Sequence, residues 1–393
     1  MSTQSSNQTS IKVLLLSAYD AASHAYWRKS LVAQFPNYDW TVLTLPPRYF
    51  AWRLRGNSLS WAFGEREVLE QDYDLVLATS MTDLSALRGF VPKLATTPTL
   101  VYFHENQFAY PESGKEYGSL EPKILNIYTA LAADKILFNS HYNRDSFLQG
   151  VAKLLKKMPD QVPPGVVEHL TQRSQVLPVP LMDQLYKSEE NQADSQAVDI
   201  AWPKPATQSD NAIRIVWSAR WEFDKGPDRL LAIMRELESR GVNYRMAIMG
   251  ERFRKIPQEF NTIEQEFSHR LDQFGFAETR EEYLAWLSAG DVVLSTATHE
   301  FQGVAVLEAV VKGCIPVLPD REVYPELFGT DYVYPHCGMY IKKEAKAAVD
   351  MITQRAEQIN SEQLLAPDAQ RFSWSELRAS YQTEMVSTSA NAD

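Results

Sequence analysis

The sequence has few cysteines and no excess of basic residues. Only Cys314 and Cys337 occur among 393 residues, which excludes a disulfide framework and leaves no cysteine spacing for a metal knuckle. The formal net charge is −11, which argues against a protein that binds nucleic acid or anionic membranes over its whole surface. A local basic patch is still compatible with this charge.

Long apolar runs are also missing. The longest runs have the length of strands, such as VLLL at 13–16, whereas roughly 20 apolar residues are needed to span a bilayer. The first residues, MSTQSSNQTS, lack the apolar core of a signal peptide. Together with the low cysteine content, these features predict a cytoplasmic protein without a membrane span.

The chain instead contains two series of alternating strands and helices. Its length fits two domains of roughly 150–200 residues each. Apolar, β-branched strands separated by helices predict parallel sheets covered on both faces. The predicted strands are 11–18, 40–45, 74–80, 99–105, 135–140, 213–220, 244–251, 291–297 and 314–319. The predicted fold class is therefore α/β, with two doubly wound, Rossmann-like domains.

Composition sets the expected domain boundaries. Residues 187–212 are polar and contain two prolines, which is typical of a linker or an exposed insertion. Two helices are expected near 260–274 and 280–290. The expected segments are a disordered tail 1–10, an N-terminal domain 11–186, the linker 187–212, a C-terminal domain 213–372, a helix 373–385 that can pack back on the first domain, and a disordered tail 386–393.

The segment THEFQGVAVLEAV, residues 298–310, has a carboxylate near each end. Glu300 follows a predicted strand, and Gly303 opens a predicted helix whose free N–H groups can hold a phosphate. Glu308 stands among apolar neighbours, where a carboxylate needs a partner, and its side chain can point back toward the helix terminus. The two acids suit sugar hydroxyls; a turn acid and a solvated helix acid are the alternative interpretation.

Two cations follow the first predicted strand of the second domain. Arg220 and Lys225 stand in the segment RWEFDKG, just ahead of a predicted helix. The planar fork of arginine and the point charge of lysine suit a diphosphate. By itself this pattern is weak, because basic residues after strands are common on protein surfaces. In doubly wound sheets, however, ligands bind beyond the carboxyl ends of the strands.

Polar residues also follow the strands of the first domain. His104 ends a predicted strand, where it could hydrogen-bond a sugar hydroxyl or give a proton to a leaving phosphate. Ser23 and His24 lie in the first strand–helix loop. Asp83 either caps the next helix or binds acceptor hydroxyls. For each histidine the alternative is a satisfied structural side chain.

A basic and aromatic run follows the second predicted strand. Arg48, Trp52, Arg53 and Arg55 interleave cations with a ring, which suits phosphate contacts and base stacking on RNA. A cation–π patch at the surface is the equal alternative. A basic helix edge adds the lysines Lys153, Lys156 and Lys157, although most runs of this kind are solvated faces.

The pattern R-x4-K-G followed by E-x7-E with an internal glycine resembles the retaining glycosyltransferases of family 4, which have the GT-B fold. More narrowly, the chain resembles the tRNA-queuosine mannosyltransferases in YFHENQFAYP (102–111), TLPPRYFAWRLRGNSLSWAF (44–63) and ILFNSHYNRDSFL (136–148). The resemblance covers most of the chain except the linker and tail. Two departures are His299, where many members have glycine, and Ala21-Ala22, where glycines are expected.

The resemblance implies the roles of the site residues. It implies two facing Rossmann-like domains with a cleft between them, a donor held mainly by the second, and no essential metal. Arg220 and Lys225 would grip the donor diphosphate, while Glu300 would contact the sugar and Glu308 the ribose. The other implied donor-binding residues are Gly250, Glu251, Gly275, Phe276, Gly303, Val304 and Ala305. His104 joins the catalytic set, and the implied acceptor-binding residues are Ser23, His24, Arg53, Asp83 and Asn106.

The activity that the resemblance implies is transfer of mannose from GDP-mannose to the cyclopentene-diol of queuosine in tRNA. No cofactor is expected besides this nucleotide-sugar donor. The departing diphosphate oxygen would take the acceptor's proton on the same face, with retention of configuration. Two alternatives remain open: the same chemistry on a lipid, glycan or small polyol, and a nucleotide-sugar-binding protein without transfer activity.

Overall fold

The computed structural model describes most of the chain as two compact units. The described residues are 10–110, 120–187, 200, 202, 212–251, 255–361 and 364–390. One unit comprises residues 1–180 and 374–393, and the other comprises residues 181–373. The expected tail 1–10 and most of the expected linker 187–212 lie outside the described residues.

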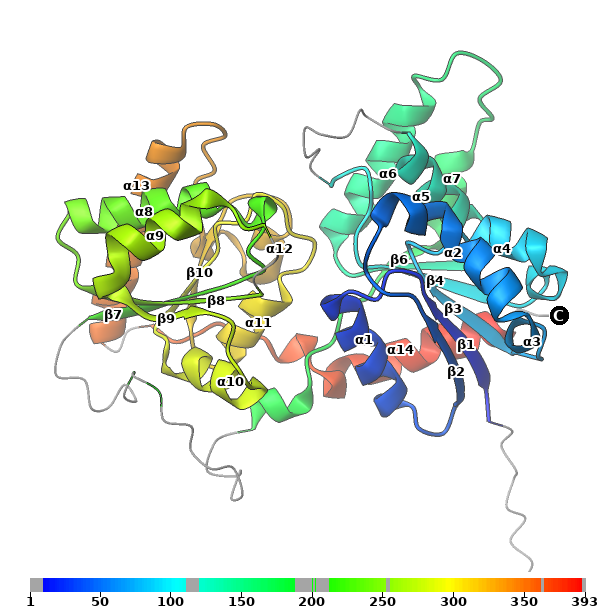
Figure 1. The fold of residues 1–393 in the computed structure, drawn as a ribbon, viewed down its shortest axis with the longest axis horizontal. Coiled ribbons are helices and arrows are strands. Elements are labelled where there is room, and N and C mark those ends of the chain that lie inside the picture. The colour runs from blue at the N-terminus through cyan, green and yellow to red at the C-terminus, as the bar shows by residue number, and fades with distance from the viewer. Residues whose placement is uncertain are drawn as a thin grey trace, which may run out of the picture. The chain divides into compact units, whose positions relative to one another are not determined.

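The first unit is a parallel, six-stranded sheet in the order β2-β1-β3-β4-β5-β6 (Figure 1). Its elements are β1 (Lys12–Ser17), α1 (Ala22–Gln34), β2 (Asp39–Thr44), α2 (Phe50–Gly64), α3 (Arg66–Leu69), β3 (Leu75–Thr79), α4 (Leu84–Phe90), η1 (Pro92–Ala95), β4 (Thr99–Phe103), α5 (Glu121–Leu131), β5 (Lys135–Phe138), α6 (His141–Leu155), α7 (Val166–Arg173), β6 (Ser174–Val176) and α14 (Trp374–Ser389). The strand order reverses at β1, so a crevice is expected between the loops that follow β1 and β3.

Alternation along its strands covers both faces of this sheet. Leu14 and Leu16 of β1 belong to a buried cluster with Leu54 of α2 and Phe147 of α6. On the opposite face Tyr102 of β4 stacks on Trp27 and Tyr381, which come from α1 and α14. Figure 1 shows α1 and α14 together under the sheet, with α2, α4, α5 and α6 above it. The last helix thus completes the core of the first unit.

The second unit is also a parallel, six-stranded sheet, in the order β12-β11-β10-β7-β8-β9. Its elements are η2 (Asp183–Tyr186), β7 (Ile213–Ser218), η5 (Phe223–Lys225), α8 (Pro227–Ser239), β8 (Tyr244–Met249), α9 (Gln258–Phe267), η6 (Ser268–Arg270), β9 (Leu271–Gly275), α10 (Arg280–Ala289), β10 (Val292–Leu294), α11 (Val304–Val311), β11 (Ile315–Pro319), α12 (Tyr324–Phe328), η7 (Thr330–Tyr332), β12 (Val333–Tyr334), α13 (Ile341–Asn360) and η8 (Gln370–Phe372). This is the Rossmann strand order, which reverses between β7 and β10.

Apolar residues of α8, α9 and α13 pack on one face of the second sheet, with Trp217 and Ile248 in the shared core. Helices α10 and α11 contact the other face through β7 and β10, and Figure 1 shows them below the strands. The prediction of two α/β, doubly wound sheets covered on both faces is confirmed.

Three local predictions were wrong. Residues 271–275 form the edge strand β9 instead of the end of a helix. The strand was not predicted because the polar residues Asp272 and Gln273 interrupt its apolar pattern. Residues 386–389 continue α14 instead of starting a disordered tail, since Met385 and Thr388 are buried. Residues 181–186 belong to the second unit, where Leu181 donates its N–H to Phe372 O at 2.7 Å.

No helix within the described ranges is both long and apolar enough to cross a membrane.

Candidate active site

The loops that follow β7 and β10 meet at a buried ion cluster. Lys225 ends η5, and its Nζ lies 3.2 Å from Asp224 Oδ2, 3.2 Å from Glu300 Oε2 and 3.0 Å from the carbonyl oxygen of His299. β7 and β10 flank the point where the strand order reverses. The structure therefore brings Lys225 and Glu300 together at the edge of the sheet where ligands of such folds bind.

Both members of this pair are held in their charged forms. Burial opposes the charge of Lys225, but Glu300 and Asp224 outweigh it and raise the pKa of the ammonium group. Burial likewise opposes ionisation of Glu300, yet Lys225 outweighs it and lowers the pKa of that carboxyl group. Glu300 Oε1 also accepts the N–H groups of Phe301 at 3.1 Å and Gln302 at 3.4 Å. The carboxylate is thus fixed by charge and by backbone.

Arg220 is the accessible cation of this site. Its side chain is 45% exposed, and Nη1 lies 2.8 Å from Glu222 Oε2; Asp224 Oδ2 is 4.0 Å from Nη2. Burial raises the pKa of Glu222, with the nearby Asp224 adding to the effect and Arg220 opposing it. The sequence indicated two cations ready for a diphosphate. In the structure, an incoming anion must compete with Glu222 for Arg220.

Glu308 has the partner that its apolar surroundings demand. It is buried in α11, and Arg280 at the start of α10 donates to both carboxylate oxygens, with Nη1 at 3.2 Å from Oε2. Arg280 was not among the predicted residues, because the pairing depends on how α10 packs beside α11. Arg280 keeps 45% of its side chain exposed, whereas the side chain of Glu308 is 6% exposed.

Two glycines shape the strand-edge loops. Gly303 adopts φ +74° at the start of α11, a backbone conformation that favours glycine; Val304 and Ala305 after it are partly exposed. A Cβ on Gly250 would lie 1.8 Å from the carbonyl oxygen of Ala219. Only glycine therefore allows the ends of β7 and β8 to approach this closely.

The remaining predicted donor residues lie at the ends of neighbouring strands. Glu251 follows β8 and is exposed. Gly275 ends β9, and Phe276 directly after it exposes 67% of its side chain. An exposed ring beyond a parallel strand is available for stacking on a base.

Glu322 is a site residue that the sequence did not reveal. Its Oε2 accepts the N–H of Glu300 at 2.6 Å and its Oε1 lies 3.1 Å from His299 Nδ1. Glu322 adopts φ +53°, an uncommon conformation for a residue with a side chain. His299 is thus built into the support of Glu300. The available signal was an acid three residues after the end of β11.

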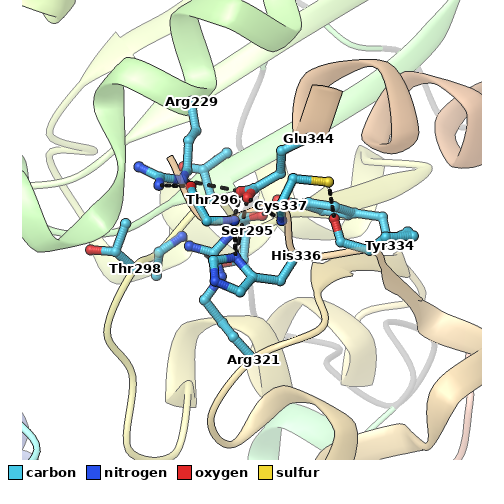
Figure 2. A network of polar contacts seen from close by, with 12 residues as sticks. Arg229, Ser295, Thr296, Thr298, Arg321, Tyr334, His336, Cys337 and Glu344 are labelled. Carbon is cyan, nitrogen blue, oxygen red and sulfur yellow. Dashed lines mark hydrogen bonds and ion pairs between the residues drawn. The ribbon is translucent and has the colours of Figure 1, made fainter. Parts of the chain in front are cut away.

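A second network lies at the same edge of this sheet. Glu344 of α13 is buried and accepts from Arg229 Nε at 3.1 Å, from Arg321 Nη2 and from the N–H of Cys337 at 3.2 Å, while His336 Nδ1 lies 3.2 Å from its Oε2. Figure 2 shows these side chains turned toward one another. Burial opposes ionisation of Glu344, but the arginines and the Cys337 N–H outweigh it and lower its pKa.

The first unit carries two histidines at its strand edge. His24 Nε2 lies 3.0 Å from Glu105 Oε2, and His24 Nδ1 lies 2.6 Å from the carbonyl oxygen of Tyr19. Burial opposes protonation of His24, but Glu105 outweighs it and raises the pKa of His24. His104 is 4.3 Å from His24 between ring centroids. Burial, with the charge of His24 adding to it, lowers the pKa of His104 well below its ordinary value.

His104 and Arg53 are buried groups with unused hydrogen-bonding capacity. His104 Nε2 and Arg53 Nε are buried, and neither has a hydrogen-bond partner among the described residues. Arg53 is 7% exposed and forms no ion pair within the described part of the chain. An uncompensated buried guanidinium is costly, so these two groups are candidates for ligand contacts.

The other predicted acceptor residues have local roles. Asp83 caps α4 by accepting the N–H of Ala86 at 3.2 Å and pairs with Arg55 at 2.9 Å. Asn106 is fully buried; its amide donates to Asn143 and accepts two backbone N–H groups, so it shapes the loop after β4 instead of presenting a free group. Ser23 is exposed and lies within α1.

Two sequence interpretations change with these positions. Ala21 has φ −64° and precedes α1 directly, so alanine fits this loop without strain. The run of Arg48, Trp52, Arg53 and Arg55 is not one surface, because Arg53 is buried and Arg55 pairs with Asp83 and Glu121. Among the described residues, no cluster of three or more His, Cys, Asp or Glu side chains could hold a metal ion.

Comparisons with known proteins are consistent across the chain. A family model described as the N-terminal part of tRNA-queuosine alpha-mannosyltransferase matches residues 12–181, and one described as glycosyl transferases group 1 matches residues 200–370. A tRNA-queuosine alpha-mannosyltransferase from Drosophila melanogaster is 32% identical over 333 residues, which cover 84% of this chain and 85% of that protein.

Solved structures share the fold at low sequence identity. The crystal structure of Anabaena HepE in complex with UDP and glucose is similar with a TM-score of 0.62 at 15% identity, covering 96% of this chain and 100% of that one. Sucrose-phosphate synthase from Thermosynechococcus elongatus gives 0.65 at 13% identity, covering 97% and 99%. These likenesses confirm the predicted GT-B class, with two Rossmann-like domains.

Proposed function

The chain belongs to the tRNA-queuosine alpha-mannosyltransferase family and is a glycosyltransferase, and from this premise we propose that it transfers mannose from GDP-mannose to the cyclopentene-diol of queuosine in tRNA. The observation that carries the proposal is the Lys225–Glu300 ion cluster at the point of strand-order reversal. It occurs in a chain that is 32% identical to a relative of that name. With this proposed acceptor we also propose that the chain acts in the cytoplasm.

The second unit is the proposed donor site. HepE, which shares the fold, was crystallised with UDP and glucose, and a nucleoside diphosphate suits the groups around β7 and β10. Arg220 would release Glu222 and pair with the diphosphate instead, and the positive charge of Lys225 would also attract the diphosphate. Glu308 with Arg280 would hold the ribose, Phe276 would flank the base, and Glu300 would orient the sugar.

The proposed reaction is a retaining transfer. The bond from the sugar C1 to the diphosphate oxygen breaks, the bond from C1 to the acceptor oxygen forms, and the acceptor's proton passes to the departing phosphate oxygen. Negative charge grows on the diphosphate as C1 becomes cationic. Arg220 and the buried Lys225 would stabilise this charge, since fixed charges in a site shielded from water need no reorganisation.

The first unit is the proposed acceptor site. The low pKa of His104 keeps its imidazole neutral, which favours a hydrogen bond to a hydroxyl over protonation of the leaving group. His24, paired with Glu105, would hold that ring in place. Arg53 would meet an anion, and the phosphate backbone of tRNA supplies one.

The test is a transfer assay with defined partners. We expect the purified chain to add the mass of one hexose to queuosine-containing tRNA in the presence of GDP-mannose, and to leave tRNA without queuosine unchanged. GDP-glucose and UDP-glucose test the donor. Transfer to glycans or small polyols with no change in tRNA would replace the acceptor in this proposal. Donor binding without turnover on any acceptor would contradict the transfer activity.

A further inference from the structure

We propose that the loop and first helical turn at residues 339–346 form an RNA-binding surface on the second unit, here named the 339–346 surface. Met339 is 94% exposed and Tyr340 is 76% exposed. With Ile341, Lys342, Lys343 and Lys346 they line a shallow hollow of about 540 Å³. The surface lies in the loop after β12 and the start of α13.

The three lysines of this surface do not stabilise α13. Lys342 and Lys343 stand in the first turn of α13, at the positive end of the helix dipole, where cations are unfavourable. Lys342 and Lys346 are four residues apart on one helix face, where like charges repel. In the part of the chain that the structure describes, none of the three lysines forms an ion pair. A polyanion would relieve all three penalties.

The loop that carries the two apolar side chains is rigidly anchored. Glu344, one turn into α13, binds Arg229, Arg321 and the N–H of Cys337, and Arg229 Nη2 also donates to the carbonyl oxygen of Gly338 at 3.1 Å. Figure 2 shows Arg229, Arg321 and Cys337 gathered around Glu344. A fixed loop presents Met339 and Tyr340 to solvent without the entropy cost of ordering them on binding.

The chemistry of the surface favours RNA over other anionic partners. An exposed tyrosine beside lysines suits stacking on an unpaired base with phosphates alongside. Anionic membranes are usually recognised by clusters of about four to eight basic residues, and the chain as a whole carries a net charge of −11. The identity of the RNA as the tRNA acceptor rests on the proposed function, while the RNA binding itself does not.

The test measures tRNA binding as a function of salt for wild type and a triple variant, Lys342→Ala, Lys343→Ala and Lys346→Ala. Each lost phosphate contact should reduce the slope of log K against log salt by about 1, hence by about 3 in total. We expect at least roughly tenfold weaker binding at low salt. The melting temperature should stay equal or rise, because the lysines oppose the helix dipole. Binding of GDP-mannose should not change.

The matched control is Lys29→Ala, Lys187→Ala and Lys255→Ala, which removes the same charge from exposed positions elsewhere in the chain. Equal weakening by both triples would overturn the proposal, because net charge alone would then explain it. For Tyr340, alanine should weaken binding to single-stranded RNA and phenylalanine should restore it. The proposal is also wrong if wild type does not bind tRNA, or if the 339–346 surface binds only phosphatidylserine vesicles.

The outcomes separate this inference from the proposed function. If wild type binds tRNA through this surface but transfers no hexose, the surface stands and the proposed function fails. If wild type transfers hexose to tRNA and the triple variant has an unchanged KM for tRNA and unchanged binding, the proposed function stands and the surface is wrong.

Discussion

The two units share a fold but differ in whether every buried cation at their strand edges has a partner. In the second unit the buried charges are compensated: Lys225 pairs with Asp224 and Glu300, and Glu308 pairs with Arg280. In the first unit Arg53 is buried without an ion pair among the described residues. His104 of the same unit has an unused ring nitrogen, and burial lowers its pKa, which favours the neutral imidazole.

This difference bears on how each edge is used. A compensated cluster is stable without a ligand, so an anionic donor must displace an internal partner such as Glu222. A buried guanidinium without a partner lowers the stability of the fold, and binding of an anion removes this penalty. Loss of Lys225 should therefore damage the fold of the second unit, whereas loss of Arg53 should spare the fold of the first.

The largest effect is expected from Lys225→Met. The change leaves the buried carboxylate of Asp224 and the partly buried carboxylate of Glu300 without their cation, which costs about 3–5 kcal/mol of unfolding free energy. Transfer should fall by on the order of 10²–10³. Denaturant unfolding and initial rates of hexose transfer measure the two effects.

A double variant distinguishes stability from activity at Lys225. Adding Glu300→Gln removes one unpaired carboxylate, so part of the lost stability should return while activity stays low. Lys255→Met, at an exposed position of the same unit, is the control for the loss of one lysine. Wild-type stability and transfer in Lys225→Met would show that the cluster is neither structural nor catalytic.

The next effect concerns the two acids of residues 298–310. Glu300→Gln removes the charge facing Lys225 and should lower transfer by about 10², with GDP-mannose binding nearly unchanged. Glu308→Gln loosens Arg280 and should weaken nucleotide binding about tenfold, or about 1.4 kcal/mol. Calorimetric Kd values and turnover numbers measure both, and Arg280→Met should reproduce the Glu308 result. Mutants that both behave like wild type would refute the two roles.

The sequence predicted the layers of the fold better than the contacts of the site. Strand–helix alternation is local, so both sheets and most elements could be predicted, whereas the polar edge strand Leu271–Gly275 could not. The apolar neighbours of Glu308 indicated that it needs a partner. Arg280, 28 residues earlier, could not be identified because the pairing depends on helix packing. Glu322 was missed for the same reason, since it reaches Glu300 across two strand ends.

A smaller effect is expected from Arg53→Met, which should not destabilise the protein as Lys225→Met does. Removing an unpaired buried charge should leave the unfolding free energy unchanged or raise it by on the order of 1 kcal/mol. The KM for tRNA should rise about tenfold with the donor KM unchanged, as expected for lost ground-state binding. The matched control is Arg66→Met, since Arg66 and its partner Glu70 are both about half-exposed and such a surface pair is worth about 0–1 kcal/mol. A clear loss of stability in Arg53→Met would break the comparison between the units.

The smallest effect is a pH dependence of donor binding that Glu222 should create. Because the pKa of Glu222 is raised, its carboxyl group is still protonated in some molecules at a pH where an ordinary carboxyl group is ionised. Protonation of Glu222 removes its ion pair with Arg220, which can then bind the diphosphate. Besides Arg220, the charges that act on Glu222 are those of Asp224, Lys225 and Glu251. A bound diphosphate adds further negative charge beside Glu222 and raises its pKa, so Glu222 should take up a proton when the donor binds. Affinity for GDP-mannose should therefore rise as pH falls through the pKa of Glu222. Calorimetry in two buffers of different ionisation enthalpy measures the proton uptake.

Glu222→Gln removes the titrating group and should bind the donor a few-fold more tightly at neutral pH, since Arg220 no longer has an ionised competitor. It should also abolish the proton uptake. Glu264→Gln, an exposed acid of α9, should change neither quantity. If Glu222→Gln binds more weakly and keeps the pH dependence, Arg220 does not exchange partners, and the compensated charges of the second unit are a fixed scaffold instead of a site that opens for its ligand.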